Sequence, residues 1–489
     1  MLVIGSAQAV NILISIFRMK LLAILLGPSG VGLFNIYNTL LQMMQQAASL
    51  GMAQSGVREI AASRGEEETL SLMRRVLFAA HLVQGMLAML AVWLLRVQIS
   101  TWLFSDASRA TEVGLIGIAI LLALLGTAQI AILQGMRRIT DLGRVTVFGA
   151  FVATLVGLAA VWMQGENGLV WFILVQPLAT VVIAQFYTRR LPRTSARHMS
   201  LADTWAAWKT MAKLGIAFML GALATTATVL LVQGRISQEL GLDAAGHFGA
   251  AWGITMTYVG FLLGAMGADY YPRLVEVIHD RTAAMRLMNI QSQLGLAIGG
   301  PVLLLLIGVA PWVITLLYSS EFAPAVTLLQ WQSLGNVFKL ASWALGFSIA
   351  ASARSKTFLI VQVNFNVLFL LILWPTLAHS GIIAAGPAFT FAYILHFLVL
   401  SILVRRIHGF RWEALSLGLL GLHVVLAVAL LALALTAPYV AAVTSVILAA
   451  VTGMIGLRVV LIKIGSESRL ATRLTSFFAR IGWPIRSTA

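Results

Sequence analysis

Long apolar runs dominate the chain, and short polar segments separate them. A helix that spans a membrane needs roughly 20 mainly apolar residues. Fourteen stretches meet this length, near 3–26, 31–55, 75–96, 112–135, 144–163, 169–188, 210–234, 246–268, 290–317, 325–350, 357–377, 382–404, 414–436 and 441–462. The pattern therefore predicts an all-α membrane protein with about 14 transmembrane helices.

The composition supports solvation by lipid. Of the 489 residues, 60% are hydrophobic and only 10% are charged, and the mean hydropathy is +0.93. About a quarter of the residues of an ordinary soluble domain are charged, so this chain cannot cover a globular surface with polar groups. Cysteine is absent, which excludes disulfides and thiolate metal sites. We expect neither a metal site nor a cofactor.

The positive charge of the chain follows its topology. If the N-terminus is cytoplasmic, 26 of the 33 Lys and Arg residues fall in the segments 56–75, 136–144, 189–213, 269–289, 353–356, 405–413 and 463–489. This asymmetry obeys the positive-inside rule. It therefore predicts a bacterial inner-membrane protein with both termini in the cytoplasm. The net charge of +16 then gives no reason to expect a nucleic-acid partner.

The outer loops are too short to form a catalytic domain, which argues against an enzyme such as a glycan polymerase. The tail is different, because apolar residues and arginines alternate with helical spacing after residue 463. This pattern is typical of an amphipathic helix that lies on the anionic inner leaflet. Membrane lipids are therefore expected partners of 463–489.

A weak repeat divides the chain. The glycines at 27, 30 and 32 with Phe34 are echoed by those at 241 and 246 with Phe248, and Gly168 with Pro177 is echoed by Gly381 with Pro387. The second copy follows by six helices, which preserves orientation in the membrane. We expect two pseudosymmetric six-helix lobes around a central cavity, at 1–205 and 206–410. Two additional helices (411–462) and the cytoplasmic tail (463–489) follow.

Polar residues recur on single faces of several predicted helices. The spacing of three and four residues within 31–55 places six of them on one face: Asn35, Asn38, Gln42, Gln45, Gln46 and Ser49. Shorter polar faces elsewhere include Asn11, Gln332, Asn336 and Asn366. Amides also join packed helices, and that explanation suffices for a single Asn or Gln. The six-residue stripe instead favours the wall of a water-filled cavity.

Four cations lie within or close to the predicted helices: Arg18, Lys20, Arg235 and Lys339. A charge in mid-membrane is costly, by about 2.5–3.5 kcal/mol on insertion scales, so such residues indicate function. Lys20 and Arg235 lie nearer the outer ends, where anchoring at headgroups is the alternative. All 17 Asp and Glu residues lie in loops or near helix ends. Buried cations without buried acids favour an anionic substrate rich in hydroxyls, such as a sugar phosphate, over a cationic drug.

Three histidines, His81, His396 and His423, lie inside predicted helices. Each is a candidate for proton coupling, because the unperturbed imidazole titrates near neutral pH. A packing role is the simpler interpretation of each histidine.

Two segments resemble a known family. Trp331-Gln332-Ser333-Leu334-Gly335-Asn336-Val337-Phe338-Lys339 resembles a motif of Wzx-type flippases for O-antigen and enterobacterial common antigen. So does Lys20-Leu21-Leu22-Ala23 followed by Gly27-Pro28-Ser29-Gly30. The resemblance covers about residues 5–408. It implies membership of the multidrug/oligosaccharidyl-lipid/polysaccharide exporter superfamily, with Lys20, Arg235 and Lys339 as cavity cations.

The resemblance also implies a function. It implies alternating access that moves undecaprenyl-pyrophosphate-linked oligosaccharide, the O-antigen or a related repeat unit, from the cytoplasmic to the periplasmic leaflet. Glycan polymerase and chain-length machinery are the partners that it suggests, and we expect a monomer. The two helices beyond residue 410 depart from the usual twelve, so a lipid II-type or exopolysaccharide flippase stays an alternative. A drug exporter of the same superfamily is the further alternative.

Overall fold

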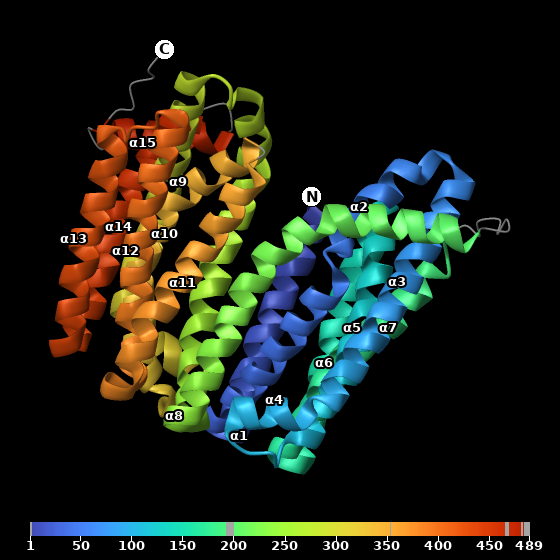
Figure 1. Ribbon diagram of the computed structural model, residues 1–489. Coiled ribbons are helices and arrows are strands. Elements are labelled where there is room, and N and C mark those ends of the chain that lie inside the picture. The colour runs from blue at the N-terminus through green and yellow to red at the C-terminus, as the bar shows by residue number, and fades with distance from the viewer. Residues whose placement is uncertain (1, 192–199, 353, 465–468, 481–482, 484–489) are drawn as a thin grey trace. The chain divides into compact units, whose positions relative to one another are not determined.

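Helices make up almost all of the chain in the computed structural model, which describes residues 2–191, 200–352, 354–464, 469–480 and 483 (Figure 1). The described residues contain no strand. Because the bilayer core offers no water to satisfy backbone N–H and C=O groups, a helix is the natural way for such apolar segments to cross it. The predicted all-α fold class is confirmed.

Glycines divide the longest helical stretches. Ten stretches of the described chain are long and apolar enough to cross a membrane. Four of these, Ala7–Ser49, Ile139–Thr188, Met219–Gly267 and Lys356–His408, have 43 to 53 residues each, about twice the usual length. Each contains one glycine with positive φ, at Gly27, Gly165, Gly241 or Gly381. Read as pairs of helices, these four bring the total within the described residues to fourteen.

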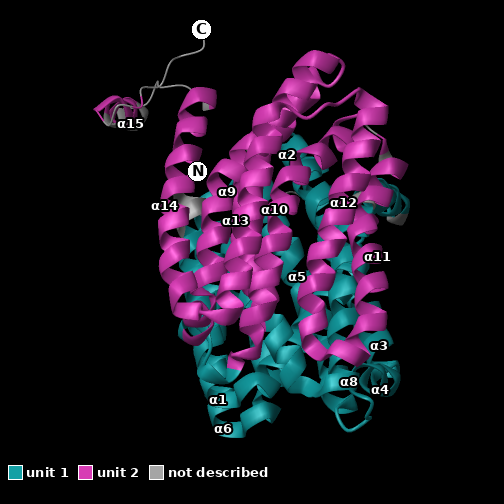
Figure 2. Ribbon diagram, turned by 90° about the vertical axis from the view of Figure 1, so that its left-hand side faces the viewer, with its two compact units in different colours: residues 1–249, 316–321 teal, residues 250–315, 322–489 magenta. Residues whose placement is uncertain are grey.

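The chain forms two compact units, which Figure 2 colours separately. Unit 1 comprises residues 1–249 and 316–321, and unit 2 comprises residues 250–315 and 322–489. The division at residue 249 lies inside α8 (Leu201–Val277), so unit 1 extends beyond the lobe boundary expected at residue 205. The six-helix lobes remain a prediction.

The described residues of unit 1 form seven helices and two 3₁₀ turns before α8 begins. They are α1 (Leu2–Ser49), α2 (Met52–Ala62), η1 (Ser63–Gly65), α3 (Glu67–Leu94), α4 (Arg96–Phe104), α5 (Ala110–Gly135), α6 (Ile139–Gln164), η2 (Gly165–Asn167) and α7 (Gly168–Thr188). Within this unit α6 packs on α7, and α5 packs on both α3 and α7.

Two features of unit 1 differ from the sequence prediction. The helix expected to continue to residue 55 ends at Ser49, because Leu50 and Gly51 both adopt positive φ and the chain restarts as α2. The segment 97–104, which lies between the stretches predicted at 75–96 and 112–135, belongs to the short helix α4 (Arg96–Phe104). Both α2 and α4 are too short to span a membrane, so a search for apolar runs cannot find them.

Unit 2 contains the end of α8 and the remaining elements. They are α9 (Arg281–Leu317), η3 (Ser320–Phe322), α10 (Pro324–Ala351), α11 (Ser355–Ser380), η4 (Gly381–Ala384), α12 (Ala385–His408), α13 (Ala414–Thr436), α14 (Pro438–Ile464) and α15 (Arg469–Arg480). The end of α9 and the start of η3 belong to unit 1. Within unit 2, α12 packs on α10 and α11, and α13 packs on α10 and α14.

The two C-terminal helices α13 and α14 are part of the body of unit 2. Gly308 of α9 lies so close to Ser445 that an added Cβ would stand 2.2 Å from its hydroxyl oxygen. The buried amide of Asn289 donates to the carbonyl of Arg411 and accepts from the backbone N–H of Glu413 and the hydroxyl of Ser416. These contacts tie the linker before α13 to α9.

The tail helix α15 is anchored to α14. Phe478 is buried and packs with Leu461, and the guanidinium of Arg458 lies 4.5 Å from the ring centroid of Trp483. The predicted tail helix is therefore present, and its apolar side meets α14. The apolar side expected for the tail after residue 463 includes Ile481, which lies outside the described residues.

The repeat predicted from the glycines has a structural counterpart in the chain breaks. Gly27 (φ 64, ψ −165) and Gly241 (φ 86, ψ 173) share one backbone conformation. Gly165 (φ 59, ψ −135) and Gly381 (φ 60, ψ −154) are similar and each opens a 3₁₀ turn. Gly168 was the sequence match for Gly381, but by conformation the counterpart of Gly381 is Gly165.

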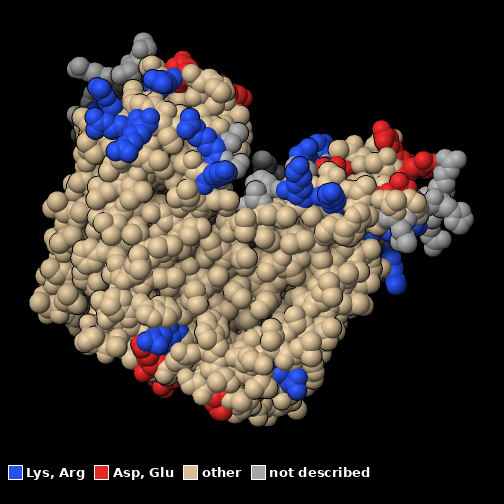
Figure 3. Space-filling view, viewed as in Figure 1, with Lys and Arg blue, Asp and Glu red and all other residues tan. Residues whose placement is uncertain are grey.

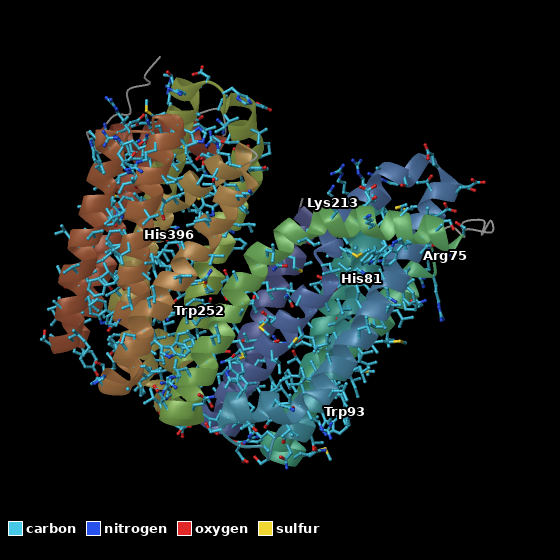
Figure 4. All side chains as sticks on the ribbon, in the orientation of Figure 1. Arg75, His81, Trp93, Lys213, Trp252 and His396 are labelled. Atoms are coloured by element: carbon cyan, nitrogen blue, oxygen red, sulfur yellow. The ribbon has the colours of Figure 1, made fainter. Side chains whose placement is uncertain are left out.

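Charged side chains gather near the ends of the helices. On the face drawn in Figure 3, a broad band shows no Lys, Arg, Asp or Glu, and the charged side chains lie above and below it. In unit 1, Arg75 and Lys213 lie toward one end and Trp93 toward the other (Figure 4). An uncharged band with interfacial tryptophan is the usual signature of a membrane-spanning body.

Candidate functional site

The polar stripe on the second half of α1 lines two hollows in unit 1. The first hollow has a volume of about 230 Å³ and is lined by Asn38, Gln42 and Gln45 of α1. The second has a similar volume of about 230 Å³ and is lined by Gln42, Gln45, Gln46 and Ser49. The hollows share Gln42 and Gln45 and therefore adjoin. The predicted cavity-wall positions Asn38, Gln42 and Gln46 thus lie together.

Helices α5 and α7 supply the facing wall of the first hollow. Thr127 of α5 accepts a hydrogen bond from the Gln45 amide at 2.9 Å, and α7 contributes Phe172 and Gln176. Neither Thr127 nor Gln176 was singled out from the sequence. Gln176 precedes Pro177 in α7, and a polar residue at a proline inside a spanning helix is the signal that could have marked it.

Arg18 joins this site from the first half of α1. Its guanidinium donates to the side-chain carbonyl of Gln176 at 2.8 Å and lies 5.8 Å from the ring centroid of Phe172. Both of these residues line the first hollow. Asn11, also predicted, is half-buried two helical turns before Arg18. The structure therefore brings one predicted cation to the edge of the amide-lined hollows.

Two other predicted cations of unit 1 have different surroundings. The Lys20 ammonium donates to the backbone carbonyl of Tyr318. Arg235 forms an ion pair with Glu239 one turn further along α8. The predicted cation Arg235 is thus already compensated by a carboxylate, which the spacing of four residues would have allowed us to anticipate.

Lys339 is the predicted cation of unit 2. It lies on α10, its ammonium is 3.6 Å from the thioether sulfur of Met256, and it is 5.5 Å from the ring centroid of Tyr393. The described residues show no carboxylate in a salt bridge with it. A cation among a thioether and an aromatic ring leaves its charge available to an anion.

The acids of unit 1 meet at helix ends. Glu166 in η2 accepts hydrogen bonds from the Ser29 hydroxyl at 2.7 Å and from the Arg109 guanidinium at 2.9 Å. The Tyr37 hydroxyl donates to Glu112 at 3.2 Å, in the first turn of α5. Partial burial lowers the pKa of Arg109, but hydrogen bonding to Glu166 outweighs it, so the pKa lies above its ordinary value. These carboxylates form hydrogen bonds between helix ends and do not line either hollow.

Comparison with known proteins identifies the family of this chain. The sequence pattern of the family described as "Polysaccharide biosynthesis protein" matches residues 21–327. That is more than half of the chain. The chain belongs to this family.

Individual relatives are more distant. The chain is 22% identical over 387 residues to the "Lipid III flippase" of Escherichia coli (strain K12), covering 77% of this chain and 91% of the relative. The relative of the same name from Shigella flexneri matches equally well, at 22% identity over 387 residues.

The fold also has solved counterparts. The structure titled "Lipid II flippase MurJ, inward closed conformation" superposes with a TM-score of 0.70 at 11% identity, over 94% of this chain and 99% of that one. An inward-facing MATE-family transporter of the MOP superfamily gives a TM-score of 0.65 at 15% identity, over 82% of this chain and 96% of that one. The chain therefore has the fold of these all-α membrane transporters, and its ten long apolar helical stretches among the described residues make it a multi-pass membrane protein.

Other predicted amides lie between packed helices. Gln332 is fully buried and accepts from the Thr255 hydroxyl at 2.9 Å. The side chain of Asn336, also fully buried, donates to the backbone carbonyl of Gln332, and the buried Asn366 donates to that of Gln362. Asn35 packs against Gly249. In these positions the amides join neighbouring turns and helices, which is the alternative role that the sequence left open.

The predicted histidines also lie among packed helices. His81 and His423 are buried, and each ring Nδ1 lies 2.8 Å from the backbone carbonyl four residues earlier. His396 is half-buried on α12, 3.0 Å from the Asn364 amide nitrogen. His81 belongs to unit 1 and His396 to unit 2, and both are labelled in Figure 4. Their role in proton coupling stays a prediction. No cluster of three or more potential metal ligands exists among the described residues.

Proposed function

We propose that the chain is a flippase for polyprenyl-pyrophosphate-linked oligosaccharide. The observation that carries this proposal is the set of contacts made by two cations of the membrane-spanning helices. Arg18 contacts an amide and an aromatic ring, and Lys339 contacts a thioether and an aromatic ring. A guanidinium or ammonium held without a carboxylate suits the pyrophosphate, because charge-assisted hydrogen bonds to phosphate oxygens are strong.

The substrate and direction are the finer part of the proposal. The lipid would be undecaprenyl pyrophosphate carrying an O-antigen or related repeat unit, moved from the cytoplasmic to the periplasmic leaflet of the bacterial inner membrane. Family membership and the name of the lipid III flippase relatives support a lipid-linked glycan. Alternating access would arise from movement of the two units, with both termini cytoplasmic and the chain acting as a monomer. Lys20 and Arg235 would be secondary anion contacts.

A lipid II-type flippase is the second candidate. The likeness to the lipid II flippase structure extends over 94% of this chain, whereas the likeness to the inward-facing MATE transporter extends over 82%. The larger coverage indicates that the likeness to the lipid II flippase structure also includes the C-terminal helices α13 and α14, which favours this candidate. Catalysis is not part of either proposal. Glycan polymerase and chain-length machinery would be partners of an O-antigen flippase only.

Membrane potential supplies a driving force in this proposal. Outward movement of an anion through an inside-negative membrane releases about 2.3 kcal/mol per charge per 100 mV. Proton coupling through His81, His396 or His423 would then be a second driving force beside the membrane potential.

Reconstitution of the purified chain in lipid vesicles tests the proposal. The probe is polyprenyl pyrophosphate carrying one N-acetylhexosamine, added to the outer leaflet only, and the readout is its protection from a membrane-impermeant enzyme that removes the sugar. We expect protection to follow the sign of an imposed potential in vesicles with the protein, and no protection in vesicles without it. Equal protection in both preparations would contradict the proposed function. Uptake of a cationic dye instead would favour a drug exporter.

A further inference from the structure

The two adjoining hollows of unit 1 have walls of neutral polar groups. Amides of α1 line them together with hydroxyls of Thr127 and Thr180, and none of the lining residues of either hollow is ionisable. Each hollow holds about 230 Å³. The pair therefore offers a space within the range of about 300–1,000 Å³ that is typical of small-molecule sites.

Many of these amides have hydrogen-bonding capacity left. Among the described residues, Asn38, Gln42 and Gln54 make no side-chain hydrogen bond. Gln46 uses only its carbonyl, which accepts from Thr226 at 2.9 Å, and Gln45 uses only its amino group, which donates to Thr127. A primary amide offers two donors and an acceptor with two lone pairs. The hollows thus present both donors and acceptors to a ligand.

An aromatic pair closes one side of the first hollow. The rings of Phe34 and Phe172 meet edge to face with centroids 5.5 Å apart, and both line the hollow. Arg18 lies beside Phe172 but keeps one guanidinium nitrogen on Gln176. The site therefore combines an apolar ring surface, a row of amides and one cation at its edge.

This chemistry excludes three kinds of ligand. A polyprenyl chain would leave the amides without hydrogen-bond partners, which is costly for buried polar groups. An organic cation would find no carboxylate to neutralise it. A free phosphate would meet one engaged guanidinium and otherwise neutral groups. A sugar ring satisfies all the features, because its hydroxyls both donate and accept hydrogen bonds and its C–H face can lie against an aromatic ring.

We infer that the paired hollows of unit 1 bind uncharged sugar residues, hexose or N-acetylhexosamine, of the transported lipid. The inference rests on the proposed function and adds that different residues bind the two parts of the substrate. The amide-lined hollows select the glycan, whereas the cations hold the pyrophosphate. A site built to hydrogen-bond hydroxyls rejects analogues that lack them, so this region determines which glycan is accepted.

Binding to two lipids by the full-length protein in nanodiscs tests the inference. The probes are polyprenyl pyrophosphate carrying one N-acetylhexosamine and the same lipid without a sugar. The variants are Asn38→Leu and Gln42→Leu, which keep side-chain size and break no described hydrogen bond. The matched control is Gln98→Leu, an exposed amide on α4 of the same unit. Gln42→Met replaces Gln42→Leu if the latter does not fold.

We expect each hollow variant to bind the glycosylated lipid about tenfold more weakly, the effect of losing one or two hydrogen bonds. Binding of the bare lipid should stay within about twofold of wild type, and Gln98→Leu should change neither. Equal binding of the glycosylated lipid by variant and wild type, or equal weakening for both lipids, overturns the inference. Failure of the wild type to bind either lipid would instead contradict the proposed function.

Discussion

Arg18, Arg235 and Lys339 differ in what surrounds their charge. Arg235 is paired with the carboxylate of Glu239, whereas Arg18 contacts an amide and Lys339 a thioether. A cation that already has a carboxylate partner gains less from an incoming anion than one without. The three residues therefore should not contribute equally to anion binding.

The first consequence is a ranking of substitutions. Arg18→Gln should slow translocation of the glycosylated lipid about tenfold or more, because charge-assisted hydrogen bonds contribute roughly 1.5–3 kcal/mol. Arg235→Gln should slow it by less than about threefold, since Glu239 neutralises the charge. Initial rates in vesicles measure both. A larger loss for Arg235→Gln than for Arg18→Gln would show that the ion pair with Glu239 opens during transport.

Sequence reasoning found part of the site at the residue scale. Helical spacing placed Asn38, Gln42 and Gln46 on one face, and the structure has them around the hollows. The partners Thr127 and Gln176 could not be predicted, because no local pattern says which helices become neighbours. The same limit explains Gln332, which shares a face with Lys339 in sequence but is buried against Thr255 of α8.

At the scale of the helices, glycines allow α1 and α8 to pack closely. Gly32 of α1 and Gly246 of α8 approach each other closely: an added Cβ on Gly32 would stand 2.3 Å from the Leu242 carbonyl oxygen, and one on Gly246 2.0 Å from that of Pro28. Both glycines lie five residues after a break of positive φ, at Gly27 and Gly241. The repeated positions thus meet each other, and only glycine allows backbones to come so near.

This contact predicts the outcome of two substitutions on α8. Gly246→Ala must push two backbones apart and should destabilise the protein by about 1–3 kcal/mol or more. Gly260→Ala should change stability little, because Gly260 has an ordinary φ and no heavy atom lies within 4 Å of the added Cβ. Thermal unfolding in detergent compares them. Equal melting temperatures would mean that the crossing of α1 and α8 is not a fixed point of unit 1.

The spanning helices were predictable from the sequence, while their breaks were only partly so. Apolar runs of sufficient length located all fourteen. Gly27-Pro28 is a recognisable break, since glycine takes positive φ and proline is favoured in the first helical turn. The break after Ser49 was less recognisable, because it involves Leu50, a non-glycine residue with positive φ, as well as Gly51. The helices α2 and α4 were missed for lack of length.

At the scale of the whole molecule, the charges that set membrane orientation differ from the charges proposed to bind substrate. Most of the net charge of +16 lies at helix ends, where it sets orientation in the membrane. Among the described residues, Arg18 and Lys339 form no salt bridge with an acid, whereas Arg235 is paired with Glu239. A transporter so built should carry negative charge outward with the help of the potential.

The most direct test of the central claim is the translocation rate of the Arg18→Gln/Lys339→Gln double variant in vesicles. Arg144→Gln is the control, because Arg144 is a surface residue paired with Asp141. If the charges of Arg18 and Lys339 each assist the pyrophosphate during transport, the double variant should move the glycosylated lipid at least about a hundredfold more slowly than wild type. Arg144→Gln should match wild type. A double variant that keeps the wild-type rate, while folded and inserted, would contradict the account.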